Sequence, residues 1–159
     1  MSAPFDEIAM TPIGRVVGGR IEATKDHWGA NRSAIMLRDD LVGPDALKGL
    51  EAHSHIEVVF YFHVNADEPT ESGARHPRGR TDWPVVGIYA QHGRMRINRI
   101  GVSICRLLGI AGLSVEVEGL DAGDGTPVLD IKPVWSGYQP RGAFREPDWA
   151  REIMANYWD

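Results

Sequence analysis

Apolar and polar residues alternate along most of the chain, which is the spacing expected of β-strands. Strands are predicted at residues 13–21, 33–37, 55–64, 85–90, 100–108, 113–119 and 128–131. The stretch 55–64 is largely apolar on both faces, which is typical of a strand inside a sheet or a barrel wall. Gly18 and Gly19 fall in the middle of the first stretch and predict a β-bulge there.

Turn and helix signals lie between and after these strands. Prolines and glycines recur through 65–84, which predicts a long loop of a kind that is usually functional or disordered. One helical turn is expected at 45–48. A C-terminal helix is expected at 147–158, where Trp149, Ile153 and Tyr157 form an apolar stripe. Many short strands without alternating helices predict a mainly β barrel or sandwich, as one domain over residues 1–159.

The single cysteine, Cys105, excludes an internal disulfide and a cysteine-rich zinc site. It lies in an apolar strand, where we expect it to act as a small buried hydrophobe. The longest apolar run, 58–62, is far shorter than a membrane span of ~20 residues. The first residues lack the basic start and apolar block of a signal peptide, so we expect a cytoplasmic protein that enters no membrane.

Arginines gather in the middle of the chain. The net charge of −5 argues against a protein that coats nucleic acid indiscriminately. Between residues 75 and 106, however, seven arginines accompany a single acidic residue, Asp82. A GC-rich genome would explain a high arginine content but not this clustering, and the planar guanidinium suits carboxylate and phosphate. The cluster therefore indicates an anionic ligand nearby.

The other residue groups and motifs give little support for a metal, nucleophile or nucleotide site. His53, His55 and Glu57 would point to one face of a strand, but no further converging ligand can be identified. Hydrogen-bonded histidines are therefore the favoured interpretation, and no metal is expected. The sequence has no G-x-S-x-G, P-loop or Rossmann glycine motif. Asp130 interrupts the apolar run 128–131, so its carboxylate is expected to pair with Lys132 or with an arginine of 94–99.

A further set of motifs is specific. The string Asp124-Gly-Thr-Pro-Val-Leu-Asp-Ile-Lys-Pro133 resembles the hallmark of the TsaA-like, or TrmO, family. Other landmarks of that family appear in order from residue 12 to residue 133: Pro12-Ile-Gly14, Leu47-Lys-Gly-Leu-Glu51 before Ser54-His55, Phe62-His63, and Arg96-x-Asn98-x-Ile100-Gly101. The resemblance implies a small, homodimeric β-barrel that uses S-adenosylmethionine as a methyltransferase without a Rossmann fold. It also implies a substrate, N6-threonylcarbamoyl-adenosine beside the anticodon of a threonine tRNA.

The arginine motif departs from the family pattern, because His92 stands where the family has an arginine and Gly93 where it has a serine. The chain also ends soon after residue 133 with an aromatic helix, whereas the tRNA-modifying bacterial members carry an additional C-terminal domain. Two alternatives to a tRNA methyltransferase therefore stay open. One is a small-molecule methyltransferase on the same scaffold, and the other is a non-catalytic S-adenosylmethionine-binding module.

The resemblance also implies site residues. The cofactor-binding residues carried over from the family are Trp28, His63, Val64, His92, Val102, Leu120, Asp121, Asp124 and Thr126. Methylation of an amide-like nitrogen releases a proton, so Asp124 and Asp130 are candidate catalytic bases. The candidate tRNA-binding residues are Arg78, Arg80, Arg96, Asn98 and Arg99. Alternatively, these arginines pair with Asp82, Glu68, Glu71 or the carboxylate of the cofactor's methionine.

Overall fold

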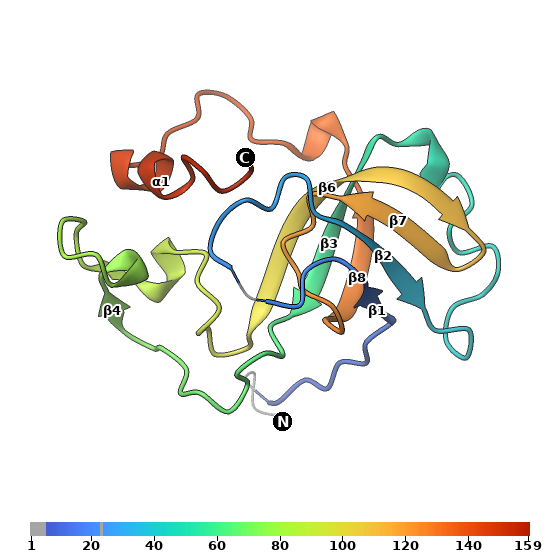
Figure 1. Cartoon of the computed structure of the whole chain (residues 1–159), viewed down its shortest axis with the longest axis horizontal. Helices are drawn as coiled ribbons and strands as arrows, with labels where there is room; N and C mark the ends of the chain where they lie inside the picture. The colour runs from blue at the N-terminus through green and yellow to red at the C-terminus, as the bar shows by residue number, and fades with distance from the viewer. Residues whose placement is uncertain (1–5, 23) are drawn as a thin grey trace.

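The computed structural model describes residues 6–22 and 24–159, and its centre is a closed antiparallel barrel (Figure 1). The barrel strands are β1 (Gly14–Val17), β2 (Arg32–Leu37), β3 (His55–Tyr61), β6 (Ile100–Ala111), β7 (Ser114–Glu118) and β8 (Pro127–Pro133). They pair in the order β1-β2-β7-β6-β3-β8, and β8 returns to β1 to close the wall. The predicted mainly β barrel with one C-terminal helix is confirmed. No helix among the described residues is long and apolar enough to cross a membrane.

Alternate residues of the strands fill the barrel, as the period of two predicts. The core takes one face from each strand, and Cys105 is part of it, as predicted. In β3 only Ile56, Val58 and Phe60 are buried, whereas the opposite face is half-exposed. The strand is part of the barrel wall, as predicted, and of its two faces only the inward one is fully buried.

The predicted β-bulge at Gly18 and Gly19 and the predicted helical turn at 45–48 are both wrong. The first strand ends at Val17, because Gly18 and Gly19 adopt left-handed φ values of 78° and 76° and form a turn instead of a bulge. Residues 45–48 form hydrogen-bonded turns without a helix, and a 3-10 helix follows at Leu50–Ala52.

The segment after β3 is built from very short elements. The predicted loop 65–84 contains β4 (Ala74–Arg75) and a 3-10 helix (Pro77–Gly79). The predicted strand 85–90 reduces to β5 (Val86–Gly87), which pairs with β4, followed by a 3-10 helix (Ile88–Ala90). The strand is short because β4 offers only two residues for pairing.

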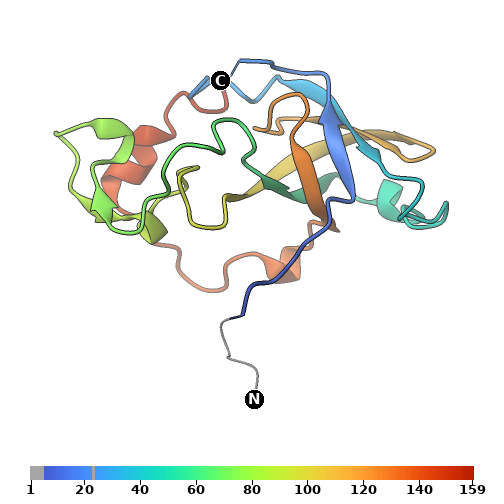
Figure 2. The same ribbon diagram turned by 90° about the horizontal axis from the view of Figure 1, so that it is seen from below.

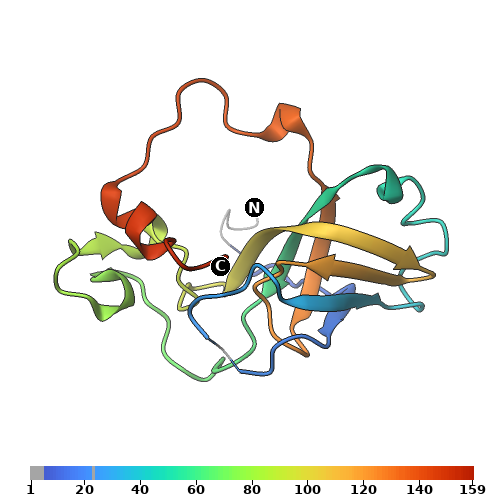
Figure 3. The same ribbon diagram turned by 45° about the horizontal axis from the view of Figure 1, so that its top comes forward.

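The C-terminal helix, α1 (Asp148–Ile153), is shorter than the predicted 147–158. A 3-10 helix (Ser136–Tyr138) and a wide arc connect β8 to α1 (Figure 3). Figures 1 and 2 show α1 beside the β4–β5 segment, away from the barrel axis. The indole Nε1–H of Trp83 joins the two parts by donating to Oε2 of Glu152 at 2.6 Å. The helix stops early because the residues after it pair with the loop before β2.

Candidate functional site

The turn between β7 and β8 is held against the turn that follows β1. The main-chain N–H of Gly18 donates to Oδ1 of Asp124 at 2.8 Å, and the N–H of Asp124 donates to the carbonyl of Arg20 at 2.9 Å. The N–H of Gly125 donates to the carbonyl of Val16 at 2.8 Å. Both turns need glycines with left-handed φ values, and together they fix the Asp124 carboxylate at one end of the barrel, where this residue is exposed.

The same turn holds three more predicted residues. Leu120 is fully buried and its carbonyl accepts from Nδ2 of Asn31 at 2.9 Å. Thr126 is buried and its hydroxyl donates to the carbonyl of Gly123 at 2.7 Å. Asp121 accepts at Oδ2 from the hydroxyl of Tyr157 at 2.5 Å, and its Oδ1 is a buried atom with no hydrogen-bond partner among the described residues.

Trp28 and His63 complete this end of the barrel. The indole of Trp28 is 5% exposed, and the guanidinium of Arg20 lies over it at 4.7 Å from the ring centroid. His63 stands beside the turn, because a Cβ placed on Gly125 would lie 3.7 Å from its Nε2. Asn31 links Trp28 to the turn, because its N–H donates to the carbonyl of Trp28 and its side chain to that of Leu120. The predicted residues Trp28, His63, Leu120, Asp121, Asp124 and Thr126 therefore lie in or beside the turn 119–126. We call this group the barrel-end site.

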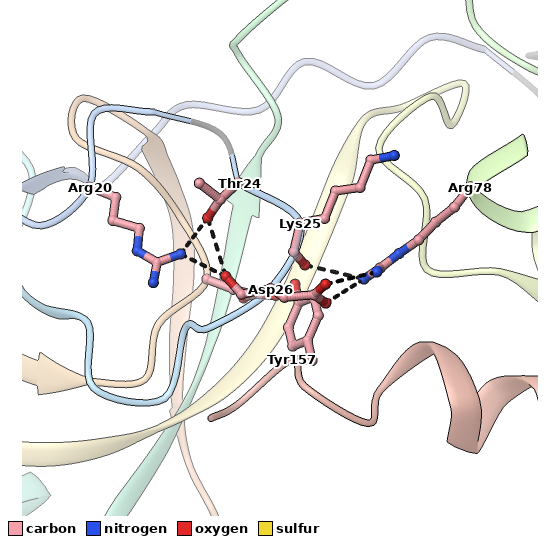
Figure 4. Close-up of polar contacts among 7 residues, drawn as sticks. Arg20, Thr24, Lys25, Asp26, Arg78 and Tyr157 are labelled. Atoms are coloured by element: carbon pink, nitrogen blue, oxygen red, sulfur yellow. Dashed lines mark hydrogen bonds and ion pairs between the residues drawn. The ribbon is translucent and has the colours of Figure 1, made fainter.

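An ion pair joins two loops that border the barrel-end site (Figure 4). Arg78 donates to both carboxylate oxygens of Asp26, at 2.9 and 3.1 Å, and to the carbonyl of Lys25 at 3.2 Å. The hydrogen bond from Arg78 lowers the pKa of the Asp26 carboxyl below its ordinary value. Figure 4 shows Asp26 between Arg20 and Arg78, with Tyr157 next to it. Arg78 is thus engaged within the protein, by an acid that the sequence analysis did not consider.

The remaining predicted cofactor and catalytic residues lie elsewhere. Val64 and His92 are exposed on loops, and Val102 is on the outer wall of the barrel, 52% exposed. Asp130 is also on the outer wall. Val59 of β3 is the register partner of Val102 in β6 and of Asp130 in β8, so the three side chains lie on the same face of the barrel. Oδ2 of Asp130 lies 2.8 Å from Nζ of Lys132, which confirms one of the two pairings predicted for it.

The predicted tRNA-binding residues are spread over two loops and differ in accessibility. Arg80 pairs with Asp82, as the alternative interpretation predicted, and its guanidinium covers Trp83 at 3.9 Å. Arg96 donates to the carbonyl of Gln91 at 2.7 Å and is half-buried, whereas Asn98 is exposed.

Arg99 is the most enclosed of these residues, with only 5% of it exposed. It donates to the carbonyls of Asn65, at 3.5 Å, and Glu68. The carboxylate of Glu68 meets Arg94 instead, at 3.8 Å. In this arrangement Arg99 joins the loop before β6 to the loop after β3.

The histidines once considered for a metal site are occupied by hydrogen bonds. The indole of Trp135 donates to Nε2 of His53 at 3.1 Å, and Nδ1 of His55 lies 2.8 Å from the hydroxyl of Ser54. Within residues 6–22 and 24–159, no group of three or more His, Cys, Asp or Glu side chains could hold a metal ion.

Sequence reasoning missed Arg20, Asp26 and Tyr157 as neighbours of the site. Tyr157 was assigned to the apolar stripe of a helix, but its hydroxyl reaches a carboxylate from another part of the chain. No local spacing connects these residues to the turn 120–126, so only the folded structure reveals them.

A closed antiparallel barrel with a polar, glycine-rich turn at one end defines the class of fold, and comparison with known proteins gives the family. Residues 22–139 match the family model of the tRNA-methyltransferase O N-terminal domain. The chain therefore belongs to this family, which confirms the resemblance seen in the sequence.

Relatives of both short and long forms are similar to this chain. A probable S-adenosyl-L-methionine-binding protein of Methanothermobacter thermautotrophicus is 35% identical over 144 residues, covering 86% of this chain and 96% of that protein. The tRNA (adenine(37)-N6)-methyltransferase of Mus musculus is 33% identical over 110 residues, which are 68% of this chain and 25% of the mouse protein.

A crystal structure of TrmO from Pseudomonas aeruginosa is similar, with a TM-score of 0.70, 28% identity, and coverage of 88% of this chain and 62% of that one. The chain spans about half the length, or less, of several other curated relatives that it matches.

Proposed function

We propose that this protein is an S-adenosylmethionine-dependent methyltransferase that acts on N6-threonylcarbamoyl-adenosine beside the anticodon of tRNA. The observation that carries the proposal is the family match over residues 22–139, which includes the whole turn 120–126. The mouse relative is named a tRNA (adenine(37)-N6)-methyltransferase, which supports adenine as the base that is modified.

The barrel-end site fits the cofactor through its unpaired acceptor. Oδ1 of Asp121 is buried without a partner among the described residues, and a buried acceptor of this kind favours a ligand that brings an O–H or N–H donor. The ribose hydroxyls and amino groups of S-adenosylmethionine are such donors. The Trp28 indole is already covered by Arg20 on one face, so adenine would stack there only after Arg20 moves. When bound, the cofactor supplies an activated methyl group.

Asp124 is the proposed base. The acceptor nitrogen loses a proton as it gains the methyl group, and an exposed carboxylate held in place can take that proton. Gly18 fixes one oxygen of Asp124 beside the other residues of the barrel-end site. Asp130 lies on the outer wall with Lys132, so it would serve only for an acceptor on that face.

The proposed tRNA surface combines the two arginine loops. Arg80 and Asn98 are exposed and are the best placed to meet phosphates, with Arg96 beside them on the loop before β6. Arg78 and Arg99 would support these loops from behind. The proposal includes a homodimer, in which a second copy doubles this surface, and a location in the cytoplasm, where tRNA is.

Two assays test the proposal. Calorimetry should detect binding of S-adenosylmethionine. The absence of both a heat signal and a thermal shift at millimolar ligand would refute the proposal. Labelled S-adenosylmethionine is then incubated with total tRNA or with a metabolite extract. Label in tRNA supports the proposal, whereas label in small molecules identifies a different substrate class. Cofactor binding without any transfer would identify a binding module, a name that the methanogen relative also carries.

The tRNA surface has its own test. Changing Arg80 to Ala should weaken tRNA binding and reduce its salt dependence by about one unit in slope, with cofactor binding intact. Arg145→Ala is the matched control, because Arg145 is an exposed arginine on the arc before α1, outside the proposed surface. Equal losses in both variants would contradict the assignment of the surface.

A further inference from the structure

The carboxylate of Asp121 is held from one side only. Oδ2 accepts from the Tyr157 hydroxyl at 2.5 Å, whereas Oδ1 is buried and has no partner in the described part of the chain. A carboxylate has two equivalent oxygens on one planar group, so a hydrogen bond to one oxygen also sets the direction of the other. Tyr157 therefore determines how the unpaired oxygen is presented.

Tyr157 is itself fixed by main-chain contacts. Its carbonyl accepts from the N–H of Trp28 at 2.8 Å, and the carbonyl of Asn156 accepts from the N–H of His27 at 3.1 Å. The residues after α1 thus lie along the loop before β2, and Figure 3 shows the C-terminus beside that loop. The Tyr157 ring also packs edge-on against Trp158, with ring centroids 4.8 Å apart.

The chemical state of Tyr157 suits a permanent donor. Burial raises the pKa of its hydroxyl far above the ordinary value of 10.0, and the nearby Asp121 acts in the same direction. The hydroxyl therefore keeps its proton at neutral pH and can donate to Asp121. A protonated phenol facing a carboxylate oxygen donates a charge-assisted hydrogen bond, which is stronger than a neutral one.

We propose that Tyr157 is a positioning residue of the cofactor site, which holds Asp121 so that its free oxygen accepts from a ribose hydroxyl or an amino group of S-adenosylmethionine. The inference rests on the proposed function for cofactor binding, and it adds a residue that lies beyond the matched family range 22–139. The C-terminal segment is then part of the cofactor site as well as a cover for one end of the barrel.

Tyr157→Phe removes the hydroxyl and keeps the ring. Calorimetry should show a dissociation constant for S-adenosylmethionine raised about tenfold, which corresponds to ~1.4 kcal/mol. Tyr138→Phe is the matched control, because Tyr138 is 82% exposed, and it should leave the dissociation constant unchanged. An unchanged constant for Tyr157→Phe, with normal binding by the wild type, would overturn the inference and leave the proposed function intact.

A double-mutant cycle separates positioning from a general structural effect. In an Asp121→Ala background, Tyr157→Phe should change the cofactor dissociation constant less than twofold, because the hydroxyl then has no carboxylate to hold. A tenfold effect that persists in this background would overturn the inference. Asp121→Val, which also lacks an acceptor, replaces Asp121→Ala if the alanine variant does not fold.

The position of the donor on the ligand is tested with a second probe, 5′-methylthioadenosine, which has the adenosine but lacks the amino acid. If the donor is a ribose hydroxyl or the adenine amino group, Tyr157→Phe weakens both ligands by the same factor. If the amino group of the methionine is the donor, only S-adenosylmethionine is weakened. A wild-type protein that binds neither ligand would refute the proposed function, and the inference with it.

Discussion

Gly29 is the position at which a single methyl group should release the C-terminal segment from the barrel end. A Cβ on Gly29 would collide with the main-chain carbonyl of Trp158. The colliding atoms belong to the backbone, so the collision cannot be relieved by a side chain that moves aside. The φ of Gly29 is not in the left-handed region, so alanine is compatible with the backbone conformation and only the collision remains. In Gly29→Ala we therefore expect the segment after α1 to move away.

The expected cost follows from the contacts that would be lost. They are the hydrogen bonds from Trp28 to Tyr157 and from His27 to Asn156, and the bond from the Tyr157 hydroxyl to Asp121. At about 1 kcal/mol each, the loss is about 3 kcal/mol. Since 1.4 kcal/mol is tenfold in an equilibrium constant, the segment should open about a hundredfold more often.

Amide hydrogen exchange measures this opening residue by residue. The amides of Trp28 and His27 should exchange about a hundred times faster in Gly29→Ala, whereas that of Ile56 in the barrel core keeps its wild-type rate. Gly43→Ala is the control, because a Cβ at Gly43 meets nothing within 4 Å. Wild-type exchange at Trp28 in Gly29→Ala would refute the reasoning that main-chain pairing holds the segment in place.

Three further predictions follow from single groups. Arg78→Gln should lower the free energy of unfolding by less than about 1 kcal/mol, because the Arg78–Asp26 pair is partly exposed. Since Arg78 lowers the pKa of Asp26 below 3.8, the difference in unfolding free energy between wild type and variant should be complete at pH 6 and shrink as the pH falls below 4. Urea titrations at each pH measure this difference, and a difference that stays constant would contradict the prediction. Cys105 should resist alkylation at pH 8 until the protein unfolds, because burial raises its pKa to about 12, and rapid labelling of the native protein by iodoacetamide would contradict its burial. Asp124→Asn should reduce methyl transfer to tRNA by at least tenfold at saturating cofactor, whereas Asp130→Asn should change it little; the reverse result would move the base to the outer wall.

The barrel could be predicted from the sequence because each strand carries its own signal. Alternation of buried and exposed residues is local, so β3, β6 and β7 were located to within a few residues. The loops could not be predicted as well. The length of the strand expected at 85–90 depends on the strand it pairs with, and β4 offers only two residues for pairing.

The candidate site was predictable only where the chain itself brings residues together. The turn 120–126 is one continuous motif, and its residues lie together as the resemblance implied. Tyr157 is far from that turn in the sequence, and its tyrosine hydroxyl gives no signal of its own. Val102 was assigned to the cofactor site by resemblance and Asp130 was a candidate base on chemical grounds, but the alternation of the strands places both on the outer wall.

The arginine cluster shows why charge counted along a window misleads. Between residues 75 and 106 a single acid accompanies seven arginines, which indicated an anionic ligand. In the folded protein Arg78 meets Asp26, Arg94 meets Glu68, and Arg106 meets Glu118 at 3.0 Å, and all three acids lie outside that window.

Four of the seven arginines are thus paired with carboxylates: Arg78 and Arg94 join loops around the barrel, Arg106 pairs across the neighbouring strands β6 and β7, and Arg80 pairs with Asp82. A phosphate could bind only to guanidiniums that remain exposed, because displacing a paired carboxylate sacrifices an existing contact. Of the arginines predicted to bind tRNA, the exposed Arg80 meets that condition best, although it must share its charge with Asp82, whereas Arg99 is enclosed by main-chain carbonyls. An RNA contact through this face is thus expected to depend on a few side chains and to be weak without a second copy of the chain.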